Sequence, residues 1–580
     1  MESDNRDDYI PGTDLIITNH EQTDGLMKHN DLVLLPQPTV SPNDPLTWSP
    51  TRKYVQLALL LIVTGLTAAT SNSISSAQDG ITNEFPDITD ENFTTGDGVL
   101  FLGIAWWTLF TAPVVYLWGS RLGYLLAMVI SIVGNVWYAN CTNVGDVVAS
   151  QLFVGASESV TEAVVQLNIT QVFFQHQANN YIGLYVLCIS VGTFLGPFIG
   201  SCITDNVGWH WVGYTGACCS GFVLILLLFG LEETYFDRAH FLAQYERAEA
   251  ENYARYEDNK KPEKLSDSSA NSKHKNHDHN VVESCHSNDS QPDIQPEQTM
   301  ASLRPSIVHE AKEGIADKPR TYWQRIALIT PAVNLRGFGF KQYVKRLFLY
   351  LQVLAFPPVV YSGLQWGAQD AWLSFYIDVE EVYYYGPPWN YSDMAVGIMN
   401  LPCLIGAFIG CVYGAWFSDW FVLWCARRNG GIREAETRLW CLLPVAFISP
   451  AGMFMLGIAT ERGYPWPVSY VGMGLIGFGW GCCGDLSMSY LVDCYPEMVL
   501  EGMVGVSLIN NNLACIFSFV VDYWMEAIGP QNTFVSVGIL EFFFIMLSLP
   551  MIYYGKTCRK WTRGMYFRFV EARDSLDRND

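Results

Sequence analysis

The chain alternates between long uncharged apolar runs and short polar breaks. Runs such as VQLALLLIVTGLTAATSNSISSA and TFVSVGILEFFFIMLSLPMIYYG reach the ~20 residues that a helix needs to cross the hydrocarbon of a lipid bilayer. The pattern predicts an all-α membrane protein with twelve transmembrane helices in two six-helix halves. We place the apolar segments at roughly 54–77, 96–117, 122–140, 146–172, 180–201, 212–232, 348–377, 394–418, 438–459, 467–492, 499–526 and 533–555.

The stretch between the sixth and seventh apolar segments has a different composition. It contains LSDSSANSKHKNHDHNVVESCHSNDSQPD, a polar, low-complexity run that could not bury enough apolar surface to fold. The domain plan is therefore a cytoplasmic N-terminal tail at 1–53, a six-helix half at 54–232, a cytoplasmic and largely disordered linker at 233–347, a second six-helix half at 348–555 and a cytoplasmic C-terminal tail at 556–580.

The cytoplasmic placement of the tails follows from the positions of Lys and Arg. If the N-terminus is inside, the inner loops hold nearly all of these residues at the segment ends, and the outer loops hold only Arg462. Glycosylation sequons at Asn92, Asn140 and Asn390 then all fall in outer loops, where modification is possible. We expect a multi-pass membrane protein with both termini in the cytoplasm.

The composition fits a membrane protein and offers no basis for an enzyme. Charged residues make up 16% of the chain, which carries a formal net charge of −23. A soluble domain has about 25% charged residues. No P-loop, GxSxG or HExxH motif is present, and the cysteines lack zinc or redox spacing. We expect no cofactor, no metal site and no nucleic-acid partner; the one histidine-rich patch, in the predicted disordered linker, comprises His274, His277, His279 and His286.

Twelve segments in two halves around a long inner linker resemble the major facilitator superfamily. The fifth segment reads GTFLGPFIGS and looks like the antiporter signature of the drug:proton branch, with Gly192, Gly196, Pro197 and Gly200 in the expected places. Glycines four residues apart let two helices approach closely, and a proline bends its helix. We expect a conformational role for these residues.

Further stretches narrow the resemblance to the Hol family of yeast histidinol/polyamine permeases. They are DPLTWSPTRKY, EETYFDR, PPWNYSD, RRNGGIREAETRLW and DCYPEMVLEG. This resemblance implies a monomeric plasma-membrane transporter that takes up polyamines, such as spermidine, and related organic cations by alternating access. A negative cell interior favours inward movement by ~2.3 kcal/mol per charge at 100 mV, so the membrane potential, protons or both could drive uptake.

The chain departs from the superfamily pattern at two places. Its first inner-loop motif reads YLWGSRLGYLL, with Ser120 near the position of the usual acid and Arg121 retained, whereas the second half keeps Asp419 in GAWFSDWF. We assign Arg121 and Asp419 to gating, and we expect the first-half contact to be weaker unless another acid substitutes. In the fourth segment, Gln151 stands where the drug:proton branch has an arginine.

Two carboxylates lie in the same fourth segment, in VGASESVTEAVVQ. A charge at the bilayer centre costs from ~3 to more than ~10 kcal/mol, so Glu158 and Glu162 require an explanation. Spaced by four residues, they share one helical face about 6 Å apart and repel each other, and an incoming cation would relieve this repulsion. The pair could also carry a proton. Alternatively, one glutamate only bonds to a neighbouring helix while the other faces a water-filled cleft.

The second half adds further candidate ligands for a cation. In SGLQWGAQDAWLSFY, Trp366 and Asp370 are four residues apart, and a carboxylate beside aromatic rings suits an alkylammonium group. Tyr376 belongs either to this site or to an interfacial aromatic belt. We expect Asp485 in the tenth segment and Asn72 in the first to face the same cavity; Glu541 has no partner that the sequence identifies.

Two other functions remain open at this stage. The same fold could export drugs or amines in exchange for protons, as the GTFLGPFIGS segment suggests. A non-transporting nutrient sensor, with partners recruited by the linker, would belong to a different functional class. The sequence favours transport, because nothing in the linker resembles a folded module.

Overall fold

The computed structural model describes residues 10–15, 41–236, 318–332 and 337–578, together with positions 28–29, 32–33, 36, 38–39, 238, 241 and 335. Most of the predicted linker, including its four histidines, and most of the N-terminal tail therefore lie outside the described residues. Contacts divide the chain into two units. The larger comprises Met1–Gln37, Trp48–Tyr235 and Arg320–Asp580, and the smaller comprises Pro38–Thr47 and Phe236–Pro319.

The larger unit contains the two predicted halves, each with six long helices. The first half holds α1 (Pro50–Asn72), α3 (Asp90–Trp118), α4 (Ser120–Tyr138), α5 (Val144–Val172), α6 (Gln175–Val207) and α7 (His210–Gly230). The second half holds α12 (Pro357–Tyr383), α13 (Asp393–Val412), α15 (Leu442–Arg462), α16 (Trp466–Cys494), α17 (Val499–Ser518) and α18 (Val521–Met546), followed by α19 (Ser548–Arg578).

Shorter elements connect these helices. They are η2 (Ser75–Ala77), α2 (Gln78–Glu84), α10 (Tyr322–Arg325), α11 (Phe340–Leu351), η3 (Gln352–Ala355), the π-helical η4 (Tyr413–Phe417), α14 (Ser418–Arg428) and η5 (Ala435–Cys441). Strand β1 (Thr13–Leu15) pairs antiparallel with β4 (Ile432–Glu434), and β2 (Lys28–His29) pairs with β3 (Leu32–Val33). In the smaller unit, Asp44 stands before η1 (Pro45–Thr47) and forms an ion pair with Arg238 at 3.1 Å.

Helix starts follow the local sequence. Ser49 precedes Pro50, whose missing N–H is no loss in the first turn of α1. Thr89 and Asn92 form a capping box at the start of α3. At the start of α5, the side-chain oxygen of Asn143 accepts a hydrogen bond from the Asp146 N–H at 2.9 Å. These caps satisfy backbone donors that the first helical turn leaves free.

Each predicted transmembrane segment overlaps a long helix, although the twelfth runs from within α18 into α19. The helices are not equally apolar. Among the described residues, nine helical stretches are long and apolar enough to cross a membrane, and α11 with α12, which meet at 83°, would form a tenth. Helices α5 and α16 fall outside that set, despite lengths of 29 residues each. Both carry acidic and small polar residues in their middle turns, so polarity rather than length sets them apart.

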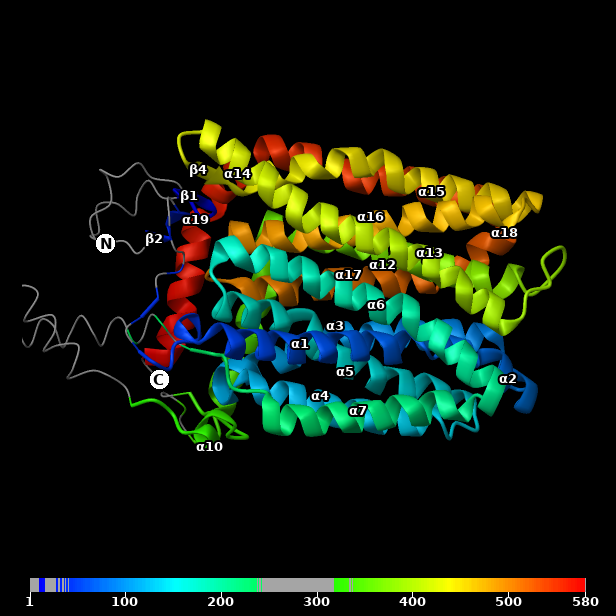
Figure 1. The fold of residues 1–580 in the computed structure, drawn as a ribbon, viewed down its shortest axis with the longest axis horizontal. Helices are drawn as coiled ribbons and strands as arrows, with labels where there is room; N and C mark the ends of the chain where they lie inside the picture. Colours follow the sequence, from blue (N-terminus) through cyan, green and yellow to red (C-terminus); the bar gives the residue numbers. More distant parts are fainter. Residues whose placement is uncertain are drawn as a thin grey trace, which may run out of the picture. The chain divides into compact units, whose positions relative to one another are not determined.

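The two halves meet along two helix pairs, α3 with α17 and α6 with α13 (Figure 1). We call the end where α7 finishes and α11 begins the linker end, and the opposite end, where α1 gives way to α2, the far end. Helix α19 crosses the linker end of the second half, where Arg573 pairs with Glu501 at 3.4 Å (Figure 1). Apolar side chains from both halves form one buried core, which fixes the helices around a central cavity.

The glycines of GTFLGPFIGS lie where α6 packs against α1. A Cβ atom on Gly196 would stand 2.6 Å from the backbone oxygen of Ala69, closer than real atoms allow, and equivalent additions at Gly192 and Gly200 would collide with Gly65 and Ser76. The close approach expected from this spacing is therefore present. Pro197 lies within α6. The conformational role of these residues stays a prediction.

Candidate functional site

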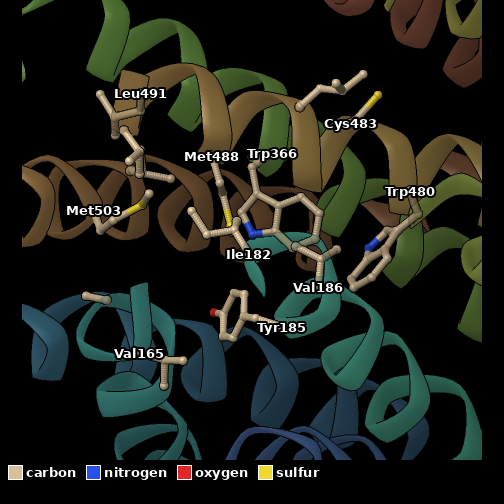
Figure 2. Close-up of a cluster of buried hydrophobic side chains, with 14 of the residues drawn as sticks. Val165, Ile182, Tyr185, Val186, Trp366, Trp480, Cys483, Met488, Leu491 and Met503 are labelled. Carbon is tan, nitrogen blue, oxygen red and sulfur yellow. The ribbon is translucent and has the colours of Figure 1, made fainter. Parts of the chain in front are cut away.

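A cavity of about 310 Å³ lies between the two halves. It reaches the far end at the exposed side chain of Asp79 and at Thr94 and Val521. Toward the linker end lies a buried apolar cluster, which we call the apolar plug (Figure 2). The plug comprises Val165, Ile182, Met488, Leu491 and Met503. The structure is therefore in a state that is closed at the linker end.

The lining of this cavity is acidic and aromatic. None of its residues is Lys, Arg or His. Five carboxyl groups line it, from Asp79, Asp97, Glu158, Glu162 and Asp370. Four aromatic rings join them, from Phe101, Tyr185, Trp366 and Trp480. A cavity with this lining attracts cations and repels anions, because nothing in its wall balances the carboxylates.

The two glutamates of α5 have different surroundings. Glu158 is half-buried and faces the cavity, where the hydroxyl of Ser71 is its hydrogen-bond partner. Glu162 also reaches the cavity, but its carboxylate accepts hydrogen bonds from Ser507, Asn510 and Asn511 of α17. This matches the alternative in which one glutamate bonds to a neighbouring helix and the other faces the cleft.

The second-half wall places a carboxylate among aromatic rings. The indole Nε1 of Trp480 donates a hydrogen bond to Asp370 Oδ1 at 3.2 Å. The rings of Trp366 and Trp480 have centroids 4.7 Å apart at an interplanar angle of 55°. Figure 2 shows both indoles beside α6, with Tyr185 near Trp366. Trp366 and Asp370 thus face one cavity, as their spacing predicts.

Tyr376 and Asp485 lie elsewhere, which corrects the expectation for both. The Tyr376 hydroxyl donates to Asn400 Oδ1 at 2.9 Å, and Asn400 in turn donates to Glu380. Tyr376 is fully buried, so it does not belong to an exposed aromatic belt. Asp485 is also fully buried and accepts a hydrogen bond from Ser489 at 3.2 Å. Neither side chain lines the cavity, and their assignment to substrate has no support from this geometry.

Helical geometry explains both corrections. Asp485 follows the cavity-lining Trp480 by five residues, which rotates it roughly 140° around α16, and Tyr376 follows Asp370 by six residues, which rotates it roughly 120° the other way. Asn72 lines the cavity as expected, although its amide donates to the Ala68 carbonyl of its own helix at 2.8 Å. Its role toward a substrate stays a prediction.

Two residues that line the cavity were not predicted from the sequence. Tyr185 on α6 lines the cavity. Asn511 lines it from α17, within the run Asn510, Asn511 and Asn512. The sequence does not identify Tyr185 as a cavity residue, because its segment has few charged residues. Which side of α6 faces the cavity depends on how the helices pack.

The structure identifies the hydrogen-bond partners of Glu541, which could not be identified from the sequence. It is fully buried and accepts hydrogen bonds from Trp372 Nε1 at 2.6 Å, from Ser449 Oγ at 2.8 Å and from Gln369 Nε2 at 2.9 Å. These donors come from α12 and α15, so the carboxylate joins three helices within the second half. It lies outside the cavity lining.

The linker ends of the two halves carry different charged contacts. In the first half, Glu233 supplies the acid that is absent near Ser120. Its carboxylate accepts a hydrogen bond from Ser120 Oγ at 2.8 Å and another from the Arg121 N–H at 3.2 Å. The Arg121 guanidinium donates to backbone carbonyls, including that of Leu228 at 2.7 Å. In the second half, Asp419 pairs with Arg438 at 2.6 Å. Another acid therefore substitutes in the first half, and the gating role of Arg121 and Asp419 stays a prediction.

The three candidate glycosylation residues lie at the far end. Asn92 is half-buried in the first turn of α3, whereas Asn140 and Asn390 are exposed in loops. The Asn140 Oδ1 atom accepts a hydrogen bond from Tyr214 at 2.8 Å. Their common end agrees with the predicted topology, and their modification stays a prediction. No group of three or more His, Cys, Asp or Glu side chains that could hold a metal occurs among the described residues.

Comparison with known proteins identifies the family. The Major Facilitator Superfamily profile matches residues 57–519. The chain belongs to this superfamily. It is 43% identical to Protein HOL1 of Saccharomyces cerevisiae, over 99% of each chain. It is 42% identical to an uncharacterised MFS-type transporter of Schizosaccharomyces pombe, over 100% of this chain and 97% of the other.

A solved structure of the superfamily confirms the fold. The proton:xylose symporter XylE, bound to 6-bromo-6-deoxy-D-glucose, superposes with a TM-score of 0.53, covering 87% of this chain and 96% of XylE. Its sequence identity is 12%, so the likeness concerns the fold alone. The predicted all-α superfamily fold and the Hol-type resemblance are both confirmed, and the protein is a multi-pass membrane transporter.

Proposed function

We propose that this protein is a plasma-membrane secondary transporter that takes up polyamines, such as spermidine, and related organic cations by alternating access. The observation that carries the proposal is the lining of the central cavity, where five carboxyl groups and four aromatic rings meet with no basic residue. Such a wall would bind a neutral or anionic substrate poorly, because its carboxylates would remain uncompensated.

The cavity offers carboxylates on both sides for the charged ends of a linear amine. Glu158 belongs to the first half and Asp370 to the second, so a substrate with two or more ammonium groups would bridge the halves. The indoles of Trp366 and Trp480 would contact a methylene chain and its cationic ends through cation–π interactions. About 310 Å³ is at the lower end of the range for ligand pockets and suits a slender molecule.

The proposed topology makes this an outward-facing state. With both termini in the cytoplasm, the far end faces outside, and Asp79 and Asp97 form an acidic entrance that raises the local concentration of cations. The membrane potential then favours entry by about 2.3 kcal/mol per charge at 100 mV. Protons are candidate co-substrates, carried by a cavity carboxylate. We propose a functional monomer, glycosylated at Asn92, Asn140 or Asn390.

One alternative keeps the fold and reverses the direction of transport. The packing of Gly192 and Gly196 against α1 fits the antiporter-like segment and is compatible with proton-coupled export of drugs or amines. Labelled spermidine supplied to cells with and without the gene separates the two directions. Uptake predicts lower accumulation after deletion, whereas export predicts higher accumulation.

A second experiment distinguishes a transporter from a non-transporting sensor. Purified protein in liposomes should accumulate labelled spermidine when the interior is made negative, and should not do so without a potential or a proton gradient. If binding occurs and no cation crosses the membrane under any gradient, the sensor hypothesis replaces the transport proposal.

A further inference from the structure

The hydrogen bonds of Glu162 cross the boundary between the two halves. Ser507 Oγ donates to its Oε2 at 2.8 Å, and Asn510 Nδ2 to its Oε1 at 2.9 Å. Asn511 Nδ2 lies 2.9 and 2.8 Å from the two oxygens. Glu162 belongs to α5 and all three donors belong to α17. We call these four residues the α5–α17 bridge.

The α17 side of this bridge is buried and positioned by its own helix. Asn510 and Asn511 are 1% and 2% exposed. The Asn511 amide also lies 3.0 Å from the Ser507 carbonyl one turn earlier, which fixes its direction. The Asn510 side chain is a hydrogen-bond partner of Asp370 as well, so it joins the carboxylates of the two cavity walls.

The adjacent Asn512 provides a contrast within the same run. Its Nδ2 atom donates to the Leu508 carbonyl of its own helix at 2.6 Å and takes no part in the bridge. The Ser507 hydroxyl, by comparison, also lies 3.2 Å from Thr108 Oγ1 of α3. Helix α17 thus holds two helices of the first half through side chains that lie one turn apart.

The location of the bridge relates it to the closed end of the cavity. Glu162 lies one turn beyond Glu158 toward the linker end of α5, and Val165 of the apolar plug follows it by three residues on the same helix. Opening the linker end separates the two halves there, so it must break the hydrogen bonds between α5 and α17. The bridge therefore exists only in states that are closed at this end.

We propose that Glu162, positioned by Ser507, Asn510 and Asn511, couples cation binding in the cavity to the opening of the linker end. This inference rests on the proposed function. The donors of the bridge are neutral, and a carboxylate bonds more strongly to a charged donor than to a neutral one. An ammonium group arriving at Glu158 lies within reach of Glu162, which exchanges its amide partners for the cation and releases α17. Glu158 is then the primary ligand, and Glu162 is a second ligand that binds the cation only by leaving its partners on α17.

The first test needs no substrate. Hydrogen–deuterium exchange is measured on purified, substrate-free wild type, Asn511→Ala and the matched control Asn512→Ala. We expect at least twofold faster exchange in peptides covering 158–170 and 500–512 for Asn511→Ala, and wild-type exchange for Asn512→Ala. Equal exchange in all three proteins would overturn the proposed bridge. Ser507→Ala serves as the second variant if Asn511→Ala fails to fold.

The second test separates affinity from turnover. For spermidine uptake, Asn511→Ala should keep KM within about twofold because the binding carboxylates are retained. The maximal rate should fall about fivefold, because the return of the unloaded protein to the closed state, in which the bridge re-forms, is slowed. Glu158→Gln should mainly raise KM. A raised KM with an unchanged maximal rate in Asn511→Ala would make Glu162 an ordinary substrate ligand and overturn the inference.

A double-mutant cycle tests whether Glu162 acts through Asn511. If Glu162 acts through Asn511, the Glu162→Gln/Asn511→Ala protein should be no slower than the slower single variant, whereas effects of Glu158→Gln and Asn511→Ala should multiply. Multiplying effects in the first pair would contradict the coupling. If the wild type neither binds nor moves spermidine, the proposed function fails, and the substrate-free exchange experiment still decides whether the bridge holds the halves together.

Discussion

The two walls of the cavity hold their carboxylates in different ways. On the first-half wall, Glu158 faces the cavity with a serine hydroxyl as its partner. On the second-half wall, Asp370 is held by the Trp480 indole and flanked by the Trp366 ring. Asp370 is therefore anchored by an indole, whereas Glu158 is not. Substitutions should affect the two walls unequally.

The largest single effect is expected at Asp370. Asp370→Asn removes the charge while keeping the size of the side chain, and leaves a substrate ammonium among indoles without a counterion. Loss of one partner from a desolvated charge pair costs about 2–5 kcal/mol, so KM for spermidine should rise about 30-fold or more. Initial rates of labelled spermidine uptake measure this, with surface expression as the control. A KM within twofold of the wild type would show that this wall is not the anchor.

Glu158→Gln should have a smaller effect that depends on substrate charge. Because Glu158 has other carboxylates beside it on the same wall, we expect KM for spermidine to rise about tenfold, equivalent to about 1.4 kcal/mol. A monoamine that occupies only the Asp370 side should lose about threefold or less. Competition by a series of monoamines, diamines and triamines against labelled spermidine checks this ranking. Equal losses for monoamines and triamines would remove the distinction between the walls.

The aromatic contribution should be smaller again. Trp366→Leu keeps an apolar side chain and removes the ring, so the loss is a cation–π contact of about 0.5–1 kcal/mol, or roughly 2- to 5-fold in KM. Trp366→Phe should recover part of it. If leucine and phenylalanine behave alike, the ring acts through volume alone and the aromatic character of this wall is irrelevant to binding.

The smallest effect is expected at Tyr376, which lies outside the cavity. Tyr376→Phe removes a hydroxyl that bonds to Asn400, and spermidine KM should stay within about twofold of the wild type. Initial rates of labelled spermidine uptake provide the measurement. A tenfold rise in KM would mean that the substrate contacts Tyr376, and that the second wall includes residues beyond those that line the cavity here.

Much of the fold follows from the sequence because hydrophobic length is decisive in a membrane. Each of the twelve predicted segments overlaps a long helix, and the segments of α5 and α16 could be recognised although both carry acids. Spacing also placed Glu158 with Glu162, and Trp366 with Asp370, on shared faces. These relations are local, because two residues spaced four apart lie on the same face of their own helix, whichever helix packs against it.

Relations between distant segments could not be obtained in this way. Asp485 was expected in the cavity because its depth along α16 is suitable, but only packing reveals that the face of Trp480 is the lining one. Glu233 takes the place of the missing acid at the linker end, although it lies 113 residues after Ser120 in the sequence. The partners of Glu162 and Glu541 likewise depend on how α17, α12 and α15 are rotated in the assembled bundle.

The central claim is that carboxylates on both walls bind a cation that the protein then carries across the membrane. The most direct measurement is labelled spermidine accumulation in liposomes that contain purified protein, at a series of imposed negative-inside potentials. We predict that accumulation by the wild type increases with the potential, and that the double variant Glu158→Gln/Asp370→Asn, purified to equal monodispersity, accumulates no more than protein-free liposomes. Undiminished accumulation by the double variant, or none by the wild type at any potential, would contradict the account.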